Sequence, residues 1–380
     1  MNLFSSDLEF LKSKDDQLIV LSDESENSLV IVSFKYQGKV FTSTSNGLKG
    51  KSFGFVNHSA FDIEDSNRHI NVYGGENRFW LGPEGGKFSL FFSPNADQIF
   101  DNWHTPPVID TESWNLLSFS KNEVIMTTST QLKNSMDVEF DIELKRKIVL
   151  SSRSEITTLL SFPVSSSVNV VAYKTENSVI NKNNFEWNEK TGTVCIWMLD
   201  MFNPSSKALT IIPYDNGDDF DFNKIAKTDY FGDIPKDRIK YGQGNIYLKT
   251  DGNYRSKLGL TALKTKSIAA NYDPDSGRLT VVTFNTDKGA TYLNQEWGMG
   301  KNTFNGDALN AFNDGPLDDG SIMGPFLELE SSSPAAFLKP NESLTHYHNV
   351  YHFVGDENSL SKITEKLLNI TIAELKTIFD

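Results

Sequence analysis

The sequence has one cysteine among 380 residues, and it lies inside an apolar run. Cys195 therefore cannot form a disulfide within the chain, and we expect it to be a buried, small hydrophobic side chain. The sequence also lacks a Cys-x-x-Cys pair, a His-Glu-x-x-His motif, a Walker loop and a Gly-x-Ser-x-Gly turn. These absences argue against zinc, nucleotide and serine-hydrolase chemistry. No cofactor is expected and no metal ligand is assigned.

Basic residues are also in short supply, with 36 Lys and Arg against 50 Asp and Glu and a net charge of −14. No basic block is longer than 145–147, so a nucleic acid would meet net repulsion and is not an expected partner. No apolar run approaches the ~18 residues of a membrane-spanning helix. Residues 1–16 lack the basic and apolar regions of a signal peptide, so the sequence as it stands predicts a cytoplasmic protein; removal of a signal peptide would make it periplasmic or secreted. The oligomeric state is not indicated.

Period-two alternation dominates what is present. Val138, Phe140, Ile142 and Leu144 alternate with acidic or basic residues, which predicts a half-buried antiparallel strand. Similar patterns predict strands at 17–21, 28–43, 123–130, 168–174, 193–199, 208–214, 245–249 and 278–285. The predicted fold class is all-β, in one domain spanning 1–380. Residues 356–380 should form a helical extension, because apolar residues share one face there and Thr371 with Glu374 is a candidate capping box.

Residues 69–86 combine five glycines with charged, imidazole and amide side chains, a composition typical of a segment that presents polar groups. Carboxylates, a guanidinium and an indole suit a polyhydroxylated ligand such as a sugar. The candidate ligand-binding residues are His69, Asn71, Glu76, Arg78, Trp80 and Glu84. The alternative is that the glycines only form tight turns and that Glu76 and Arg78 form a structural ion pair.

A second polar segment, 302–320, is rich in Asn and Asp. Asp307, Asn310, Asn313 and Asp314 can hydrogen-bond sugar hydroxyls or supply oxygen ligands to a hard cation. Their alternative role is to stabilise an ordered loop through Asx-turns.

In a third segment, 324–353, a strand over 326–330 would place Glu328 and Glu330 on the same face. Two such carboxylates repel each other, which raises the pKa of one and suits it to proton transfer. His346, His348 and His352 are likewise evenly spaced on a following strand. They could hold a metal, or they could be surface residues and single ring donors.

Several long motifs carry a resemblance that runs from about residue 7 to 355. HINVYGGENRFWLGPEGGKFSLFF, DNWHTPPVIDTESW and LELESSSPAAFLKPNESLTHYHNVYHF resemble a family of uncharacterised bacterial proteins, frequent in Bacteroidetes, that is grouped with the galactose mutarotase-like proteins. The resemblance implies a β-supersandwich of large antiparallel sheets with a carbohydrate-binding groove on a concave side.

The C-terminal part is also similar to the aldose 1-epimerases. Residues 338–342, LKPNE, resemble the turn that follows the catalytic glutamate of those enzymes, with Asn341 in place of glycine. Gapless counting from Pro334 puts Leu329 at the position of that base, between Glu328 and Glu330. The histidine motifs of those enzymes have no counterpart, and His69 and His104 match them only loosely.

Three functions follow from these patterns. The leading hypothesis is a carbohydrate-binding protein that acts on or senses a mono- or oligosaccharide. The runner-up is an active aldose 1-epimerase-type isomerase, with Glu330 or Glu328 as the base and His104 or His346 as the acid. The third is a noncatalytic structural or partner-binding module whose groove is filled by its own loops.

Overall fold

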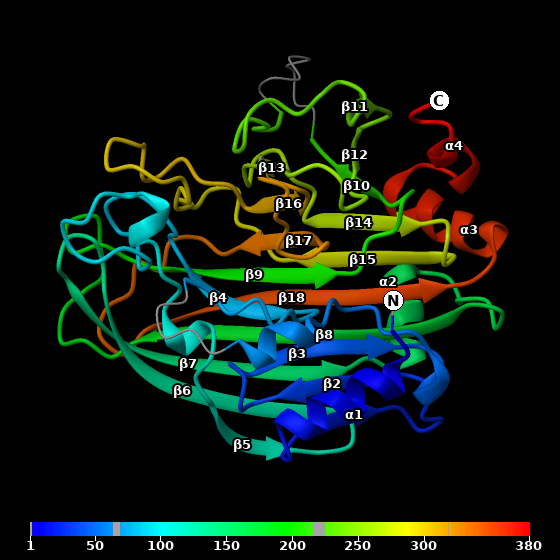
Figure 1. The fold of residues 1–380 in the computed structure, drawn as a ribbon, viewed down its shortest axis with the longest axis horizontal. Coiled ribbons are helices and arrows are strands. Elements are labelled where there is room, and N and C mark those ends of the chain that lie inside the picture. The colour runs from blue at the N-terminus through cyan, green and yellow to red at the C-terminus, as the bar shows by residue number, and fades with distance from the viewer. Residues whose placement is uncertain (1, 64–68, 216–224, 318) are drawn as a thin grey trace.

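The computed structural model describes residues 2–63, 69–215, 225–317 and 319–380. Within these residues, antiparallel strands form sheets of ten, five and three strands (Figure 1). The two smaller sheets pack against one face of the ten-stranded sheet, and side chains from all three meet in one large apolar core. The protein is therefore a sandwich with one large layer and a divided second layer.

The ten-stranded sheet is the wide layer that runs across Figure 1. Its strands, in spatial order, are β11 (Ile239–Gly242), β12 (Asn245–Lys249), β10 (Leu209–Pro213), β14 (Ile268–Asp273), β15 (Arg278–Phe284), β18 (Ser343–Val354), β8 (Asn169–Asn181), β7 (Glu139–Leu150), β6 (Glu123–Lys133) and β5 (Asn115–Phe119). The alternation that predicted β7 is confirmed, because Phe140, Ile142 and Leu144 face the core while Glu139 is exposed. Arg146 continues the inward row and is also buried, which the alternation alone did not predict.

The second layer consists of the two smaller sheets. The five-stranded sheet has the order β13 (Ser256–Leu260), β16 (Leu309–Asn313), β17 (Leu327–Ser332), β9 (Cys195–Phe202) and β4 (Arg78–Gly82), and the three-stranded sheet has the order β1 (Ile19–Ser22), β2 (Leu29–Ser33) and β3 (Lys39–Thr44). Cys195 on β9 is buried and unpaired, as expected. Short segments join the strands through 3-10 turns at Gly47–Lys49, His58–Asp62, Phe100–Asn102 and Pro107–Ile109.

Helices cover the outer faces of these layers. They are α1 (Phe4–Lys14), α2 (Arg153–Leu160), α3 (Glu357–Leu368) and α4 (Ile372–Lys376). As predicted, α3 and α4 follow the last strand, and Thr371 with Glu374 forms a capping box. The apolar faces of α2, α3 and α4 pack on the ten-stranded sheet, on the side away from the five-stranded sheet. The sequence patterns missed α1, which packs on the three-stranded sheet, and α2.

The predicted all-β fold with short C-terminal helices is thus confirmed. None of the helices in the described ranges is both long and apolar enough to cross a membrane.

Candidate functional site

Strand β17 places carboxylates and apolar side chains on opposite faces of the five-stranded sheet. Leu329 contributes to the main core between the sheets, and Ser331 points the same way, toward β18. Glu328 and Glu330 therefore point to the opposite, outer face, as the predicted strand required. Leu329, the residue at the epimerase base position, is fully buried and carries no ionisable group there.

Charged side chains from neighbouring strands pair with these two carboxylates. Arg78 of β4 donates to Oε1 of Glu328. Lys257 of β13 donates to Oε2 of Glu330 at 2.9 Å, and the indole Nε1 of Trp197 on β9 donates to the same oxygen at 2.9 Å. Oε1 of Glu330 has no hydrogen-bond partner among the described residues. We refer to Arg78, Glu84, Lys257, Glu328 and Glu330 as the outer cluster.

A cavity of about 760 Å³ opens beside the outer cluster. Glu84 and Lys257 line it directly, so Lys257 connects the cavity with the buried Glu330 carboxylate. Its aromatic and basic lining comes from Phe100, Tyr230, Phe231, Trp297, Arg255 and Lys301. The cavity thus combines flat apolar rings with hydrogen-bonding groups, a combination typical of small-molecule sites.

Burial changes the acidity of several of these groups. It raises the pKa of Glu328 to about 7, with the Glu330 carboxylate adding to the rise and Arg78 opposing it. Burial also raises the pKa of Glu84, against the attraction of Lys257. For Lys257 burial lowers the pKa, but Glu330 and the other carboxylates outweigh it and the net shift is upward. Lys257 therefore stays charged at neutral pH, while Glu328 titrates near neutrality.

The histidines of β18 lie on the other side of the five-stranded sheet. The Ser331 hydroxyl lies 2.8 Å from Nε2 of His346 and 2.7 Å from Nδ1 of His348, and Nε2 of His348 lies 2.6 Å from Asp200. The three histidines of β18, His346, His348 and His352, are all fully buried. The sequence correctly placed them on one face, but that face is closed inside the sandwich, so His346 does not reach the cavity.

Glu76 belongs to the same interior region and not to the cavity. Its carboxylate accepts hydrogen bonds from the backbone and hydroxyl of Ser43, both at 2.6 Å, and Nε2 of His352 lies 3.0 Å from it. We refer to Glu76, Asp200, Ser331, His346, His348 and His352 as the inner cluster. The hypothetical Glu76–Arg78 ion pair is not formed, because Arg78 pairs with Glu328 while Glu76 is bonded to Ser43 and His352.

Segment 74–82 is also more buried than its composition suggested. Trp80 is only 4% exposed, and its ring packs edge-on against that of Trp197. The central carbon of the Arg78 guanidinium lies 5.1 Å from the centre of the Trp80 ring. Trp80 supports the outer cluster from below and is not among the residues that line the cavity. Within 74–82 the side chains of Glu76, Arg78 and Trp80 are therefore buried, whereas His69, Asn71 and Glu84 on either side of this segment are partly exposed.

Of the remaining candidates from the first polar segment, His69 lies near the cavity, whereas Asn71 is held by Asp110 and does not line it. The ring of His69 is 4.4 Å from that of Phe100, a cavity residue, and 4.7 Å from that of His104. Asn71 is bonded to the Asp110 carboxylate at 3.0 Å. Neither imidazole lines the cavity, so no described histidine is placed to exchange a proton there.

The second polar segment divides between cavity-lining and structural positions. Asp314 lines the cavity and accepts the Gly324 N–H at 2.7 Å. Asp307 accepts the Tyr230 hydroxyl, and Asn310 lies beside it. Asn313 stabilises the turn after β12, because its side-chain oxygen accepts a hydrogen bond from the Gly252 N–H at 2.9 Å. In the described ranges, no group of three or more His, Cys, Asp or Glu side chains is arranged to hold a metal ion.

The sequence interpretation did not include several residues that shape the cavity. Lys257 follows an ordinary period-two pattern in β13, where Ser256 and Leu258 face inward, and this alternation was the available signal. Tyr230 and Trp297 come from irregular segments whose position depends on tertiary contacts. No local pattern identifies such residues.

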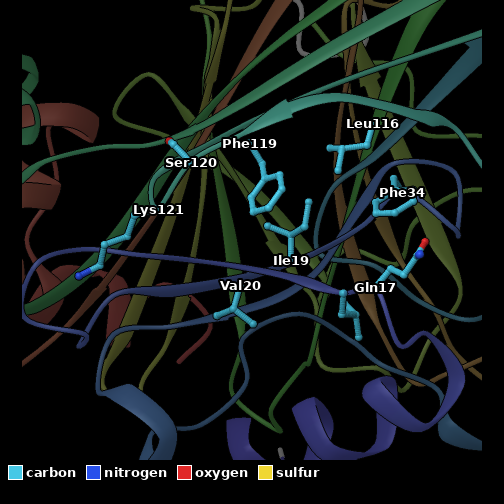
Figure 2. Close-up of a pocket in the computed structure, with 9 residues that line it drawn as sticks. Gln17, Ile19, Val20, Phe34, Leu116, Phe119, Ser120 and Lys121 are labelled. Carbon is cyan, nitrogen blue, oxygen red and sulfur yellow. The ribbon is translucent and has the colours of Figure 1, made fainter.

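A different cavity, of about 510 Å³, lies between β1 and the edge strand β5 (Figure 2). Ile19, Phe34, Leu116 and Phe119 point toward one another across it, and Lys121 is its one charged lining residue. It lacks the paired charges of the outer cluster, so we regard the cavity beside β13 as the candidate site.

The chain has relatives among known proteins at the level of a family model and of the fold. A family model described as a family of unknown function (DUF6786) matches residues 2–379, and no curated protein matches the chain. A solved structure from Escherichia coli K12, provisionally described as an aldose 1-epimerase, has a TM-score of 0.53 and 12% identity, covering 88% of this chain and 98% of the other. The Slr1438 protein from Synechocystis sp. PCC 6803 has a TM-score of 0.54 and 15% identity, covering 88% and 95%. At these identities the likeness shows the fold alone.

Proposed function

The chain belongs to the DUF6786 family, whose function is unknown, and we propose that it binds a saccharide in the cavity beside the outer cluster. One observation carries this proposal: paired charges and aromatic rings converge on a single cavity. Trp297 and Phe100 offer flat apolar faces on which a sugar ring can stack. Glu84, Lys257 and Gln295 offer donors and acceptors for hydroxyl groups. The mutarotase-like fold of the neighbouring structures supports a sugar-related role.

Binding can be tested by ligand-observed NMR and calorimetry with glucose, galactose, glucuronic acid and galacturonic acid. We expect Trp297→Ala to weaken the binding of the best ligand at least tenfold, because a stacking surface is lost. Phe119→Ala is the matched control, since it truncates an aromatic side chain at the other cavity. Equal affinities in both variants and the native protein would refute this site.

A second function is anomer interconversion with Glu328 or Glu330 as the base. The raised pKa of Glu328, about 7, suits proton transfer at neutral pH, but this carboxylate pairs with Arg78 and neither glutamate is among the residues that line the cavity. The reaction also needs a group that protonates the ring oxygen, and no described histidine lines the cavity. We therefore expect little acceleration of mutarotation. Anomer exchange measured by NMR tests this; a rate enhancement that disappears in Glu330→Gln or Glu328→Gln, with the fold intact, would favour the enzyme.

A further inference from the structure

A second chamber adjoins the candidate site. It has a volume of about 440 Å³ and shares three lining residues, Asp229, Tyr230 and Glu296, with the 760 Å³ cavity. Both volumes fall within the range of about 300–1,000 Å³ that is usual for small-molecule sites. Each chamber is therefore large enough to hold a ligand unit of its own, and the two meet along a common wall.

Tyr230 forms the centre of this wall. Its hydroxyl donates to Asp307, and Lys227 and Lys257 place their ammonium groups 4.8 and 5.7 Å from its ring centre. Lys227 lines the second chamber and Lys257 lines the first. The tyrosine is thus held in place by contacts from both chambers.

The wall is completed by Glu296 and by a glycine on β13. Glu296 pairs with Lys227 and, at 2.9 Å, with Lys301 of the first chamber. Gly259 lines the second chamber, where an added Cβ would lie 1.9 Å from Oδ2 of Asp307. The absence of a side chain at this position leaves room for the carboxylate that anchors Tyr230.

The two chambers differ in chemistry. The first has aromatic walls that suit ring stacking. The second is lined mainly by hydroxyl, amide and carboxylate groups, from Thr228, Asp233, Thr261, Asn294, Asn305 and Asp307. Such groups suit the hydroxyls of a more exposed sugar unit, which can be held by hydrogen bonds alone.

We propose that the two chambers are adjacent subsites for one oligosaccharide of at least two units, which crosses the wall at Tyr230. This inference rests on the proposed saccharide binding and adds its substrate class. One unit stacks in the aromatic chamber beside the outer cluster, and the next occupies the polar chamber.

The first test compares ligand lengths. An array of mono-, di- and trisaccharides identifies the best disaccharide, and calorimetry then compares it with its constituent monosaccharides. We expect the disaccharide to bind at least tenfold more tightly than either unit. Equal affinities would overturn the two-subsite inference but leave saccharide binding standing. Absence of binding across the whole array would overturn both.

The second test uses variants that affect one chamber each. Asp233 and Asn305 are exposed and line the second chamber alone, so Asp233→Ala combined with Asn305→Ala should leave the fold intact. We expect this variant to lower the ratio of disaccharide to monosaccharide affinity about tenfold. Phe100→Ala, an exposed change in the first chamber, is the matched control and should weaken both ligands without lowering the ratio. The same ratio in both variants would overturn the inference.

Discussion

The inner and outer clusters lie on opposite faces of the same five-stranded sheet, and their carboxylates differ in how completely they are hydrogen-bonded. On β17, Glu330 belongs to the outer cluster and the next residue, Ser331, to the inner one. In the inner cluster, the Glu76 and Asp200 carboxylates are closed off by protein partners; Asp200 accepts from Asn77 and contacts His348, both at 2.6 Å. In the outer cluster, one oxygen of Glu330 is unpartnered among the described residues and a cavity adjoins the group. The carboxylates of the inner cluster are therefore fully engaged by protein partners, whereas the outer cluster keeps one carboxylate oxygen without a partner among the described residues.

The largest expected effect is on the inner side. Glu76→Ala should lower the free energy of unfolding by about 3–5 kcal/mol, because Ser43 and His352 would lose a buried carboxylate partner. Urea denaturation measures this change. Glu84→Ala is the matched control on the outer side and should cost less than about 1 kcal/mol, since Glu84 borders open space. A similar cost for both changes would remove the distinction between the clusters.

The pH dependence of stability should also separate the two clusters. Burial, with a smaller contribution from His348, lowers the pKa of His346 from 6.5 to about 3. Between these values the unfolded chain binds a proton that the folded chain does not, so stability falls as the pH falls from 6.5. One such proton corresponds to about 1.4 kcal/mol per pH unit. His346→Gln should reduce the slope of stability between pH 6.5 and 4 by about this amount, measured by urea denaturation at several pH values.

Glu328 should show the opposite sign. Its pKa is raised from 4.5 to about 7, so the folded chain retains a proton that the unfolded chain releases. Its contribution is complete below pH 4.5 and is lost as the pH rises through 7. Glu328→Gln should therefore lose less stability than the native protein between pH 5 and 7.5. Parallel pH profiles for the native protein and both variants would contradict the assignment of opposite signs.

A smaller loss of stability is expected for Lys257→Met. This change removes one of the two donors to Oε2 of Glu330 and leaves Trp197 as the other, so we expect a cost of about 1–3 kcal/mol. Saccharide binding should be lost, because Lys257 also lines the cavity. Denaturation and calorimetry on the same sample separate the two effects. Full binding by a Lys257→Met protein would place the ligand elsewhere.

The smallest effect is expected for Arg78→Lys. Lysine keeps the positive charge but not the planar guanidinium that pairs with Glu328 and stacks on Trp80, so the cost should be about 1 kcal/mol. Because Arg78 is not among the lining residues, saccharide affinity should fall less than about threefold. A large loss of affinity with unchanged stability would place Arg78 in direct contact with the ligand.

The sequence predicted much of this arrangement because strand periodicity is local. It gave most of the central strands and the shared face of Glu328 and Glu330. It also put His346 and His348 on one face, but it could not say which face of a sheet meets another sheet, because that depends on long-range pairing. The same limit applies to Tyr230, which is placed by contacts with distant residues.

The alternation along β17 has a consequence for how such a site can change over evolutionary time. Because the side-chain period of a strand is two, the insertion of one residue directly after Leu327 would turn both carboxylates into the core and Leu329 to the outer face. The length of this strand is therefore fixed by folding. The outer face can be altered by substitution at alternate positions, or by lengthening the loops that form the far walls of the two chambers, but not by a single-residue shift.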